Sequence, residues 1–374
     1  MKESAAPRGP IALFLPKLED GGAENVMLQL AASFQARGHD VDLVVGVPGG
    51  PLEFKVPGTV RRVDLAAPRT LHALPALVRY LRRERPRALL STLEHSNIVA
   101  TGAGRMALTG TRVVLREARV LLPREQRRGW RTDALYLAMR GVYRAASAVI
   151  AVSKGVAESL RTDLGLPSDR IHTIYNPVVT EDLPRMAAAT LDDPWFVPGA
   201  PPVVLGVGRL VAQKDFPTLL RAFAKVRAQR PARLVILGEG ADRPDLERLA
   251  GELGVATDVR LPGFERNPFR YMQRATVFAL SSVLEGLPGV LIQAMACGCR
   301  VISTDSPGGS REILEDGALG PLVAPGDDAA LAAGIAALLA DADKTPARPR
   351  YPLARFSERT AVDDYLRVLG VGSN

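Results

Sequence analysis

Short β-rich runs alternate with longer amphipathic stretches along almost the whole chain, and this alternation limits the fold more than any other feature. Apolar runs are followed by segments with the 3.6-residue periodicity of helices. In the first half, the predicted strands cover residues 11–15, 41–47, 88–93, 112–116, 148–152 and 171–174. The predicted helices between them cover residues 24–36, 74–85, 98–108 and 132–144. Such alternation is typical of parallel sheets covered by helices on both faces.

The alternation stops at residues 178–202, where prolines and scattered acids favour a linker between domains. It resumes with predicted strands at 203–207, 234–237, 259–261, 277–280 and 301–304, separated by helices at 215–230, 245–253, 268–275 and 288–296. We therefore predict an α/β protein of two doubly wound, Rossmann-like domains facing across a cleft, with boundaries at residues 1–180 and 181–356. Sheets of this type bind ligands at the carboxyl ends of their strands.

The excess of positive over negative charge is confined to the first half of the chain. The net charge is +8, yet the first 180 residues carry 26 Lys and Arg against 16 Asp and Glu, and the remainder has a net charge of −2. The excess is densest at Arg79, Arg82, Arg83, Arg85 and Arg87, and again at Arg124, Arg127, Arg128 and Arg131. Such a face is either an ordinary solvated surface or one that meets anions. Aromatic residues make up 5% of the chain and no nucleic-acid motif accompanies the arginines. We expect an anionic membrane surface or a lipid-linked anion as partner, and no nucleic acid.

Neither a membrane span nor a disulfide is expected. The longest apolar stretch, residues 329–340, is shorter than the about 18 residues that cross a bilayer, and the run at residues 11–15 is too short for a signal peptide. Cys297 and Cys299 lie two positions apart within one apolar run, which suits neither a disulfide nor a zinc site. We expect a cytoplasmic protein, associated at most peripherally with the inner face of the plasma membrane.

A glycine pair follows the first predicted strand. Gly21 and Gly22 precede the helix at residues 24–36, so the backbone can approach a ligand closely and the helix N-terminus can face a phosphate. The segment lacks the spacing of a Walker loop or of a dinucleotide site. A plain tight turn is the more ordinary explanation, so as a lone signal the glycine pair is weak.

The second half carries a denser set of candidate residues. Arg209 and Lys214 follow the strand at 203–207, and they place two cations where a diphosphate leaving group would need them. Glu285 follows the predicted strand at 277–280. A helix is expected to begin at about Pro288, with Gln293 two turns into it. An acid near a helix N-terminus and a polar side chain on that helix can together bind hydroxyl groups of a ligand. Pairing of Arg209 with an acid, or capping by Glu285, would be the structural alternatives.

These motifs resemble those of the retaining glycosyltransferases of family 4, which have the GT-B fold. The resemblance covers nearly the whole chain. It rests on Gly-Gly-Ala-Glu at 21–24, Tyr-Asn-Pro at 175–177, Gly-Arg-Leu at 208–210 with Lys214, the run at 284–298, and Ser-Thr-Asp at 303–305 with the segment 308–314. It implies a nucleotide-sugar donor, UDP- or GDP-linked, held mainly by the second domain. It also implies that a helix in residues 357–374 packs back on the first domain.

The resemblance assigns roles to individual residues. Arg209 and Lys214 would hold the diphosphate, Glu285 would contact the donor sugar, and the base would lie against Gly263 and Phe264. The backbone amides of the segment that includes Leu287, Gly289 and Val290 would contact sugar and phosphate. One position departs from the family pattern, because Gln293 stands where a second Glu normally accepts hydrogen bonds from the ribose hydroxyls. An amide can still bond to a diol, but donor affinity or donor choice is expected to differ.

The residues that would bind the acceptor are less clear from the sequence. Many family members present a histidine after a first-domain strand, whereas here the strand at 112–116 is followed by Glu117, which we nominate in its place. His95 and Asn97 follow the preceding strand and are neighbours by topology. Asp-x-Asp triplets occur at 40–42 and 341–343, but neither lies where a metal–nucleotide clamp would be expected.

The resemblance implies a mechanism with retention of anomeric configuration, in which the leaving phosphate oxygen takes the acceptor proton, so no protein base, metal or cofactor is required. We expect transfer of a hexose or N-acetylhexosamine to a growing glycan, on a polyprenyl diphosphate, in cell-surface polysaccharide synthesis. Two alternatives stay open. One is another GT-B enzyme, such as a nucleotide-sugar epimerase or a phosphorylase. The other is a noncatalytic sugar-nucleotide-binding protein, which Gln293 motivates.

Overall fold

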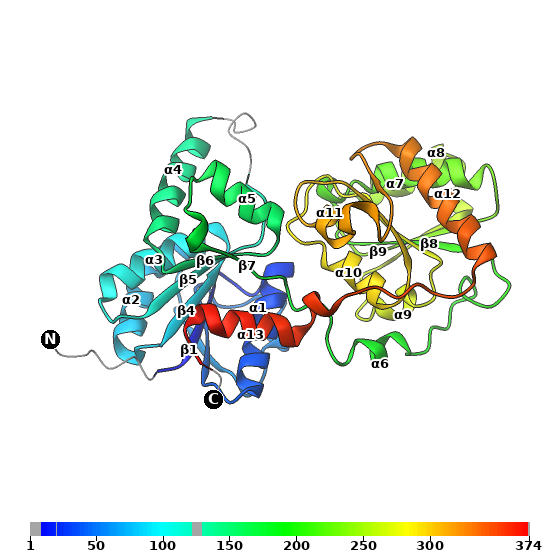
Figure 1. Ribbon diagram of the computed structural model, residues 1–374. Coiled ribbons are helices and arrows are strands. Elements are labelled where there is room, and N and C mark those ends of the chain that lie inside the picture. Colours follow the sequence, from blue (N-terminus) through cyan, green and yellow to red (C-terminus); the bar gives the residue numbers. More distant parts are fainter. Residues whose placement is uncertain (1–8, 20, 122–128, 373–374) are drawn as a thin grey trace. The chain divides into compact units, whose positions relative to one another are not determined.

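The computed structural model describes residues 9–19, 21–121 and 129–372, and it divides the chain into two compact units. Residues 1–177 and 358–374 form the first unit, and residues 178–357 form the second. Each unit is built on one all-parallel sheet with helices between the strands (Figure 1). The predicted α/β class with two Rossmann-like sheets is confirmed. The arginine cluster at 124–131 lies outside the described side chains.

The first unit has a seven-stranded sheet in the order β3-β2-β1-β4-β5-β6-β7. Its strands are β1 (Ile11–Leu15), β2 (Val41–Val45), β3 (Arg61–Asp64), β4 (Ala88–Thr92), β5 (Arg112–Glu117), β6 (Ala148–Ala151) and β7 (Ile171–Thr173). Its helices are α1 (Gly22–Ala36), α2 (Leu74–Glu84), α3 (Glu94–Ala107), α4 (Trp130–Ala145), α5 (Lys154–Asp163) and α13 (Glu358–Leu369). Strands β1, β2 and β4 are buried along their whole length, as strands of a doubly covered sheet should be, and only β1 is apolar throughout.

Arg116 joins three distant segments of the first unit. Its side chain is 1% exposed and bonds to neutral groups. Nε donates to the hydroxyl of Tyr365 in α13 at 3.0 Å, Nη1 to Thr92 Oγ1 at 3.0 Å, and Nη2 to Asn176 Oδ1 at 2.7 Å. Helix α13 also packs its apolar face into the core of the first unit, where Figure 1 shows it in red against α1. The last helix of the chain is thereby part of the first unit.

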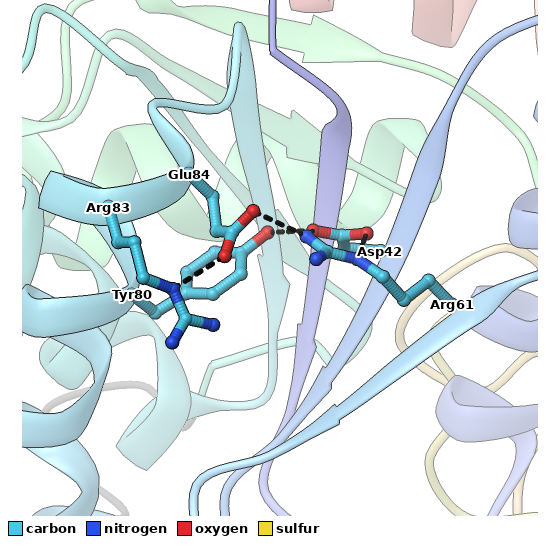
Figure 2. Close-up of polar contacts among 5 residues, drawn as sticks. All are labelled: Asp42, Arg61, Tyr80, Arg83 and Glu84. Carbon is cyan, nitrogen blue, oxygen red and sulfur yellow. Dashed lines mark hydrogen bonds and ion pairs between the residues drawn. The ribbon is translucent and has the colours of Figure 1, made fainter.

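A second polar network surrounds Asp42 on β2, and Figure 2 shows its members. The Asp42 carboxylate is 2% exposed; it accepts a hydrogen bond from the Tyr80 hydroxyl at 2.6 Å and one from Arg61 Nε at 2.7 Å. Arg61 also bonds to Glu84 at 2.9 Å, and Arg83 bonds to the other oxygen of Glu84 at 2.7 Å. Burial raises the pKa of Tyr80, so its hydroxyl stays a donor. Asp42 is therefore fully engaged in holding α2 and β3 against β2.

The second unit has a six-stranded sheet in the order β10-β9-β8-β11-β12-β13. Its strands are β8 (Val203–Val207), β9 (Arg233–Leu237), β10 (Val259–Gly263), β11 (Val277–Leu280), β12 (Arg300–Thr304) and β13 (Leu322–Val323). Its helices are α6 (Leu183–Ala187), α7 (Phe216–Arg227), α8 (Arg243–Glu252), α9 (Phe269–Met272), α10 (Gly289–Ala296), α11 (Ser310–Ile313) and α12 (Asp328–Lys344). The two short edge strands, β3 and β13, are absent from the sequence prediction because neither has a buried apolar run.

Residues 178–202, predicted to be a linker, are an ordered part of the second unit. Helix α6 packs on α9, and Trp195 is 7% exposed between two guanidinium groups, with Arg260 at 4.0 Å and Arg233 at 4.9 Å from its ring centre. Cation–π contacts of this kind fix an indole against the surface that it covers. This proline-rich segment is therefore packed on the second unit, and the linker prediction is wrong.

Candidate active site

The centre of the second sheet supplies a ligand-binding edge. Strands β8 and β11 are neighbours, and the chain runs outward from β8 through β9 to β10 but from β11 through β12 to β13. This change of direction is the topological switch point, where the loops after two adjacent strands diverge and leave a crevice. Arg209 follows β8 and Glu285 follows β11, so both come from loops at that point.

An ion pair joins these two loops. Lys214 Nζ donates to Glu285 Oε1 at 2.5 Å, and the two side chains are only 16% and 9% exposed. The backbone holds the pair in register, because Val283 N donates to Gln213 O at 3.0 Å and the Gln213 side chain donates to Leu284 O at 2.7 Å. Two residues 71 positions apart are thus brought together, and both were selected from the sequence.

Arg209 lies between β8 and Lys214, on the same connection that forms this pair. Its side chain is exposed, and within the described part of the chain it makes no hydrogen bond or ion pair. The alternative that an acid pairs with Arg209 therefore finds no support in the described residues. An unpaired guanidinium with five donors on a loop at the switch point is suited to the bidentate recognition of a phosphate.

Helix α10 begins next to Glu285. Its first residue is Gly289, so Pro288 is the N-cap and not the first helical residue as predicted, and no side chain caps this end. Leu287 is buried, whereas Gly289, Val290 and Gln293 are partly accessible. An uncapped helix start leaves backbone N–H groups for an anion or a hydroxyl.

The loop after β12 closes over the Glu285 backbone. Glu285 N donates to Pro307 O at 3.2 Å, and a Cβ placed on Gly308 would lie 2.0 Å from Glu285 O. Gly308 has a φ of +124°. Only glycine combines that backbone conformation with so close an approach. Residues 308–314 belong to the motifs that resemble the family, but the sequence alone does not indicate this contact.

Gly263 and Phe264 lie at the carboxyl end of β10. Gly263 O accepts a hydrogen bond from Gly238 N at 2.8 Å, which ties this end of β10 to the end of β9. Phe264 is 63% exposed, an unusual state for a large aromatic side chain. Arg243, which pairs with Glu239, donates to Leu261 O at 2.6 Å and braces the same segment. An exposed ring on a braced loop offers a flat apolar face to a nucleotide base.

Glu117, nominated for the acceptor side, ends β5 in the first unit. Its side chain is 2% exposed and accepts hydrogen bonds from the Tyr143 hydroxyl at 2.6 Å and from the amides of Ala118 and Arg119 at 3.0 and 3.2 Å. Burial is the main cause that raises its pKa to about 7, and the Tyr143 hydrogen bond opposes that rise. These three bonds give Glu117 a structural explanation, and its catalytic role stays a prediction.

Asn97 belongs to the same network. Its side-chain amide donates to the Tyr143 hydroxyl at 2.9 Å, so Asn97 and Glu117 meet through a residue that sequence reasoning did not select. Tyr143 is 1% exposed within an amphipathic helix, where nothing in the sequence distinguishes it from an ordinary core aromatic. His95, by contrast, is exposed on the first turn of α3.

Gly21 and Gly22 lie at the start of α1, which begins at Gly22 and so two residues earlier than predicted. Gly21 is the N-cap, and a Cβ placed on it would lie 2.1 Å from a carboxylate oxygen of Glu24. Glu24 is 6% exposed, and burial raises its pKa. An anion at this helix start would meet the carboxyl group of Glu24, so a phosphate role for the two glycines stays a prediction that the geometry does not strengthen.

Other chemistry is sparse in the described ranges. No group of three or more His, Cys, Asp or Glu side chains there is placed to hold a metal ion. Cys297 and Cys299 are buried free thiols, whose pKa values burial raises to about 11 and about 12. No helix in that part of the chain is long and apolar enough to cross a membrane.

Comparisons with known proteins give the family. The model described as "Glycosyl transferases group 1" matches residues 189–351, and the model described as "Glycosyltransferase Family 4" matches residues 20–182. The N-acetylgalactosamine-N,N'-diacetylbacillosaminyl-diphospho-undecaprenol 4-alpha-N-acetylgalactosaminyltransferase of Campylobacter jejuni is 34% identical over 200 residues, 54% of this chain and 53% of that protein. The chain therefore spans about half the length of that relative. The lipopolysaccharide core biosynthesis glycosyltransferase LpsE of Rhizobium meliloti is 27% identical over 94% of this chain and 96% of that protein.

Solved structures share the fold. The apo form of the lipopolysaccharide outer core galactosyltransferase WaaB superposes with a TM-score of 0.71 at 19% identity, over 96% of this chain and 99% of that chain. Anabaena HepE in complex with UDP and glucose gives a TM-score of 0.72 at 19% identity, over 97% of each chain. With family models matching both halves and a common fold, the chain belongs to the group 1 glycosyltransferases with the GT-B fold.

Proposed function

We propose that this glycosyltransferase transfers a hexose or N-acetylhexosamine from a UDP- or GDP-sugar with retention of configuration and without a metal ion. The observation that carries the proposal is the exposed Arg209, unpaired among the described residues, on the loop that forms the Lys214–Glu285 pair at the switch point. The two cations would face the diphosphate, and the carboxylate would face the hydroxyls of the sugar. Preorganised cations stabilise the charge that develops on the leaving diphosphate, which is the role that a metal ion has in other transferases.

The proposed mechanism needs no protein base. As the glycosidic bond to the leaving diphosphate breaks, the acceptor hydroxyl attacks the anomeric carbon on the same face, and its proton passes to the leaving phosphate oxygen. Lys214 donates to Glu285 in the described structure, so donor binding would share this lysine between the carboxylate and the phosphate. The guanidinium of Arg209 would meet the phosphate without first leaving a partner in the described part of the chain.

The first experiment is calorimetric binding of a panel of nucleotide sugars in EDTA, with wild type and Arg209→Ala. We expect selective binding of one donor and a loss of affinity of about tenfold or more in the variant, because a charge-assisted bidentate contact is removed. Arg248→Ala is the matched control, since Arg248 is exposed on α8 and its ion pairs are with acids of its own helix. Equal loss in both variants, or no donor bound by the wild type, would contradict the proposal.

Gln293 gives a second, independent variant. Gln293→Glu restores the acid of the family pattern, and a carboxylate accepts hydrogen bonds from a ribose diol more strongly than an amide does. We expect donor affinity to rise several-fold. Donor binding without turnover on any lipid-linked acceptor would instead favour the noncatalytic sugar-nucleotide-binding protein. The anomeric configuration of the product, read from its NMR coupling constants, tests retention, and activity lost in EDTA would refute metal independence.

For the acceptor we propose a glycan on a polyprenyl diphosphate, used in cell-surface polysaccharide synthesis at the inner face of the plasma membrane. Two observations support it: the basic excess of the first half of the chain, and the name of the Campylobacter relative, which specifies a diphospho-undecaprenol acceptor. Flotation with vesicles tests the membrane part. Stronger recovery with anionic than with neutral vesicles is expected, and equal recovery with both would refute it.

A further inference from the structure

A groove of about 420 Å³ lies in the first unit, apart from every residue assigned to the donor. Its walls come from α2 and the short helix before it (Thr70–Ala73), from α3 and from the second half of α4. The lining includes Leu71, Leu74, Ile98, Gly102, Gly141 and Val142. This volume falls in the range of about 300–1,000 Å³ that is usual for ligand sites, and most of its lining is apolar.

Exposed apolar side chains gather around the same helices. Among the described residues, eight large apolar side chains are exposed, and four of them lie on these helices or at their ends. They are Leu71 (54% exposed), Met106 (54%), Leu108 (87%) and Leu137 (72%). Single exposed leucines need no explanation, but Leu71 lines the groove and the other three lie on helices that form it or at their ends, which favours an interaction site on this part of the first unit.

The groove also has a cation in its wall. Ile98, Gly102 and Arg105 recur at helical spacing on α3 and line the groove together. Arg105 is exposed and, within the described ranges, forms no hydrogen bond or ion pair. Exposed Arg140 precedes the groove-lining Gly141 on α4. Apolar walls with such a guanidinium fit a molecule that has a hydrocarbon chain and an anionic group.

We propose that this groove binds the hydrocarbon chain of a phosphate-bearing lipid acceptor, with Arg105 facing its anionic end. The proposal rests on the proposed function, because it names the part of the acceptor that the first unit holds. A recess between three helices suits a single inserted hydrocarbon chain. Insertion of the chain removes the apolar walls from water, which is the main source of affinity for such a ligand.

Gly141 allows a direct test. It lies within α4 at a negative φ, and a Cβ placed on it would have nothing within 4 Å. Gly141→Leu should therefore fill the groove without a clash, and Gly141→Ala is the matched control with the same removal of a helix glycine. The probe is farnesyl diphosphate, with inorganic diphosphate as the ligand that lacks the chain, and binding is measured by calorimetry below the micelle concentration.

We expect Gly141→Leu to weaken farnesyl diphosphate binding by about tenfold or more, Gly141→Ala to stay within about twofold of wild type, and Arg105→Ala to weaken it also. Equal affinity of wild type and Gly141→Leu, or inorganic diphosphate bound as tightly as the farnesyl ester, would overturn the proposal. Stronger vesicle flotation of Gly141→Leu, with unchanged farnesyl diphosphate binding, would show a membrane-docking face instead. Because the assay needs neither donor nor turnover, its failure is distinguishable from failure of the proposed transfer reaction.

Discussion

Replacing Glu117 by glutamine separates a structural carboxylate from a reacting one. The carboxylate is buried and its pKa is raised to about 7 from an ordinary value of 4.5. The folded state therefore binds the proton more tightly than the unfolded state does. This tighter proton binding stabilises the folded state fully below about pH 4.5, and the stabilisation is lost as the pH rises through 7. At about 1.4 kcal/mol for each tenfold difference in proton affinity, the loss amounts to about 3 kcal/mol.

Glutamine does not ionise, so the Glu117→Gln variant would not lose this contribution. We expect the free energy of unfolding of Glu117→Gln, relative to wild type, to rise by about 3 kcal/mol between about pH 4.5 and pH 8. Urea unfolding at both pH values, followed by hydrogen exchange in peptides from β5, measures the difference within the first unit. Tyr143→Phe is the companion variant: it removes the hydrogen bond that lowers the pKa, so the loss of stability should become larger and should extend to higher pH.

Two results would refute this reasoning. One is a difference between wild type and Glu117→Gln that stays the same at both pH values, because the pKa of Glu117 would then be ordinary. The other concerns activity at the higher pH. A general acid or base contributes about 10²- to 10⁴-fold to a rate, so a loss of that size in Glu117→Gln, with its fold intact, would make Glu117 catalytic. A structural Glu117 predicts activity within a few-fold of wild type.

Three further substitutions test the packing described above. Gly308→Ala should abolish donor binding, because its Cβ would lie 2.0 Å from Glu285 O, whereas Gly58→Ala, with open space around it, should bind donor as wild type does. Lys214→Ala should lower the stability of the second unit by about 3 kcal/mol by leaving a buried carboxylate unpaired, and adding Glu285→Gln should restore stability in thermal unfolding but not donor binding. Tyr80→Phe removes a hydrogen bond to the buried Asp42 and should cost about 1–3 kcal/mol in urea unfolding.

The central strands and the site loops were predictable because each carries its own local signal. Strand β1 is an unbroken apolar run and β4 begins with one, and Lys214 and Glu285 each follow a predicted strand. Parallel topology then brings such loops to one edge without any knowledge of distances. The ion pair itself was not foreseen, because a sequence shows which residues share an edge but not which side chains touch.

The rest depended on contacts that leave no local pattern. Residues 178–202 look like a linker from their prolines, yet Trp195 holds them to the second unit through two arginines distant in sequence. Tyr143 joins Asn97 to Glu117 from a helix position that periodicity assigns to an ordinary core. The attachment of α13 to the first unit was expected from the family resemblance, but the buried hydrogen bond between Arg116 and Tyr365, 249 positions apart, was not. Composition and spacing cannot reveal partnerships of this kind.

For the basic residues of the first unit too, composition gives the total charge, but only the contacts show which side chains are used within the fold. In the cluster at residues 79–87, Arg82 donates to Met106 O, Arg83 pairs with Glu84, and Arg87 donates to Gly9 O, so part of the charge is used within the fold. Arg105, by contrast, is free within the described ranges and lines an apolar groove. A nucleic acid would gain from cations and aromatic stacking surfaces, and a bare sugar phosphate from cations alone. Apolar walls beside a guanidinium of this kind favour a ligand with both a chain and a charge, and a lipid-linked diphosphate is such a ligand.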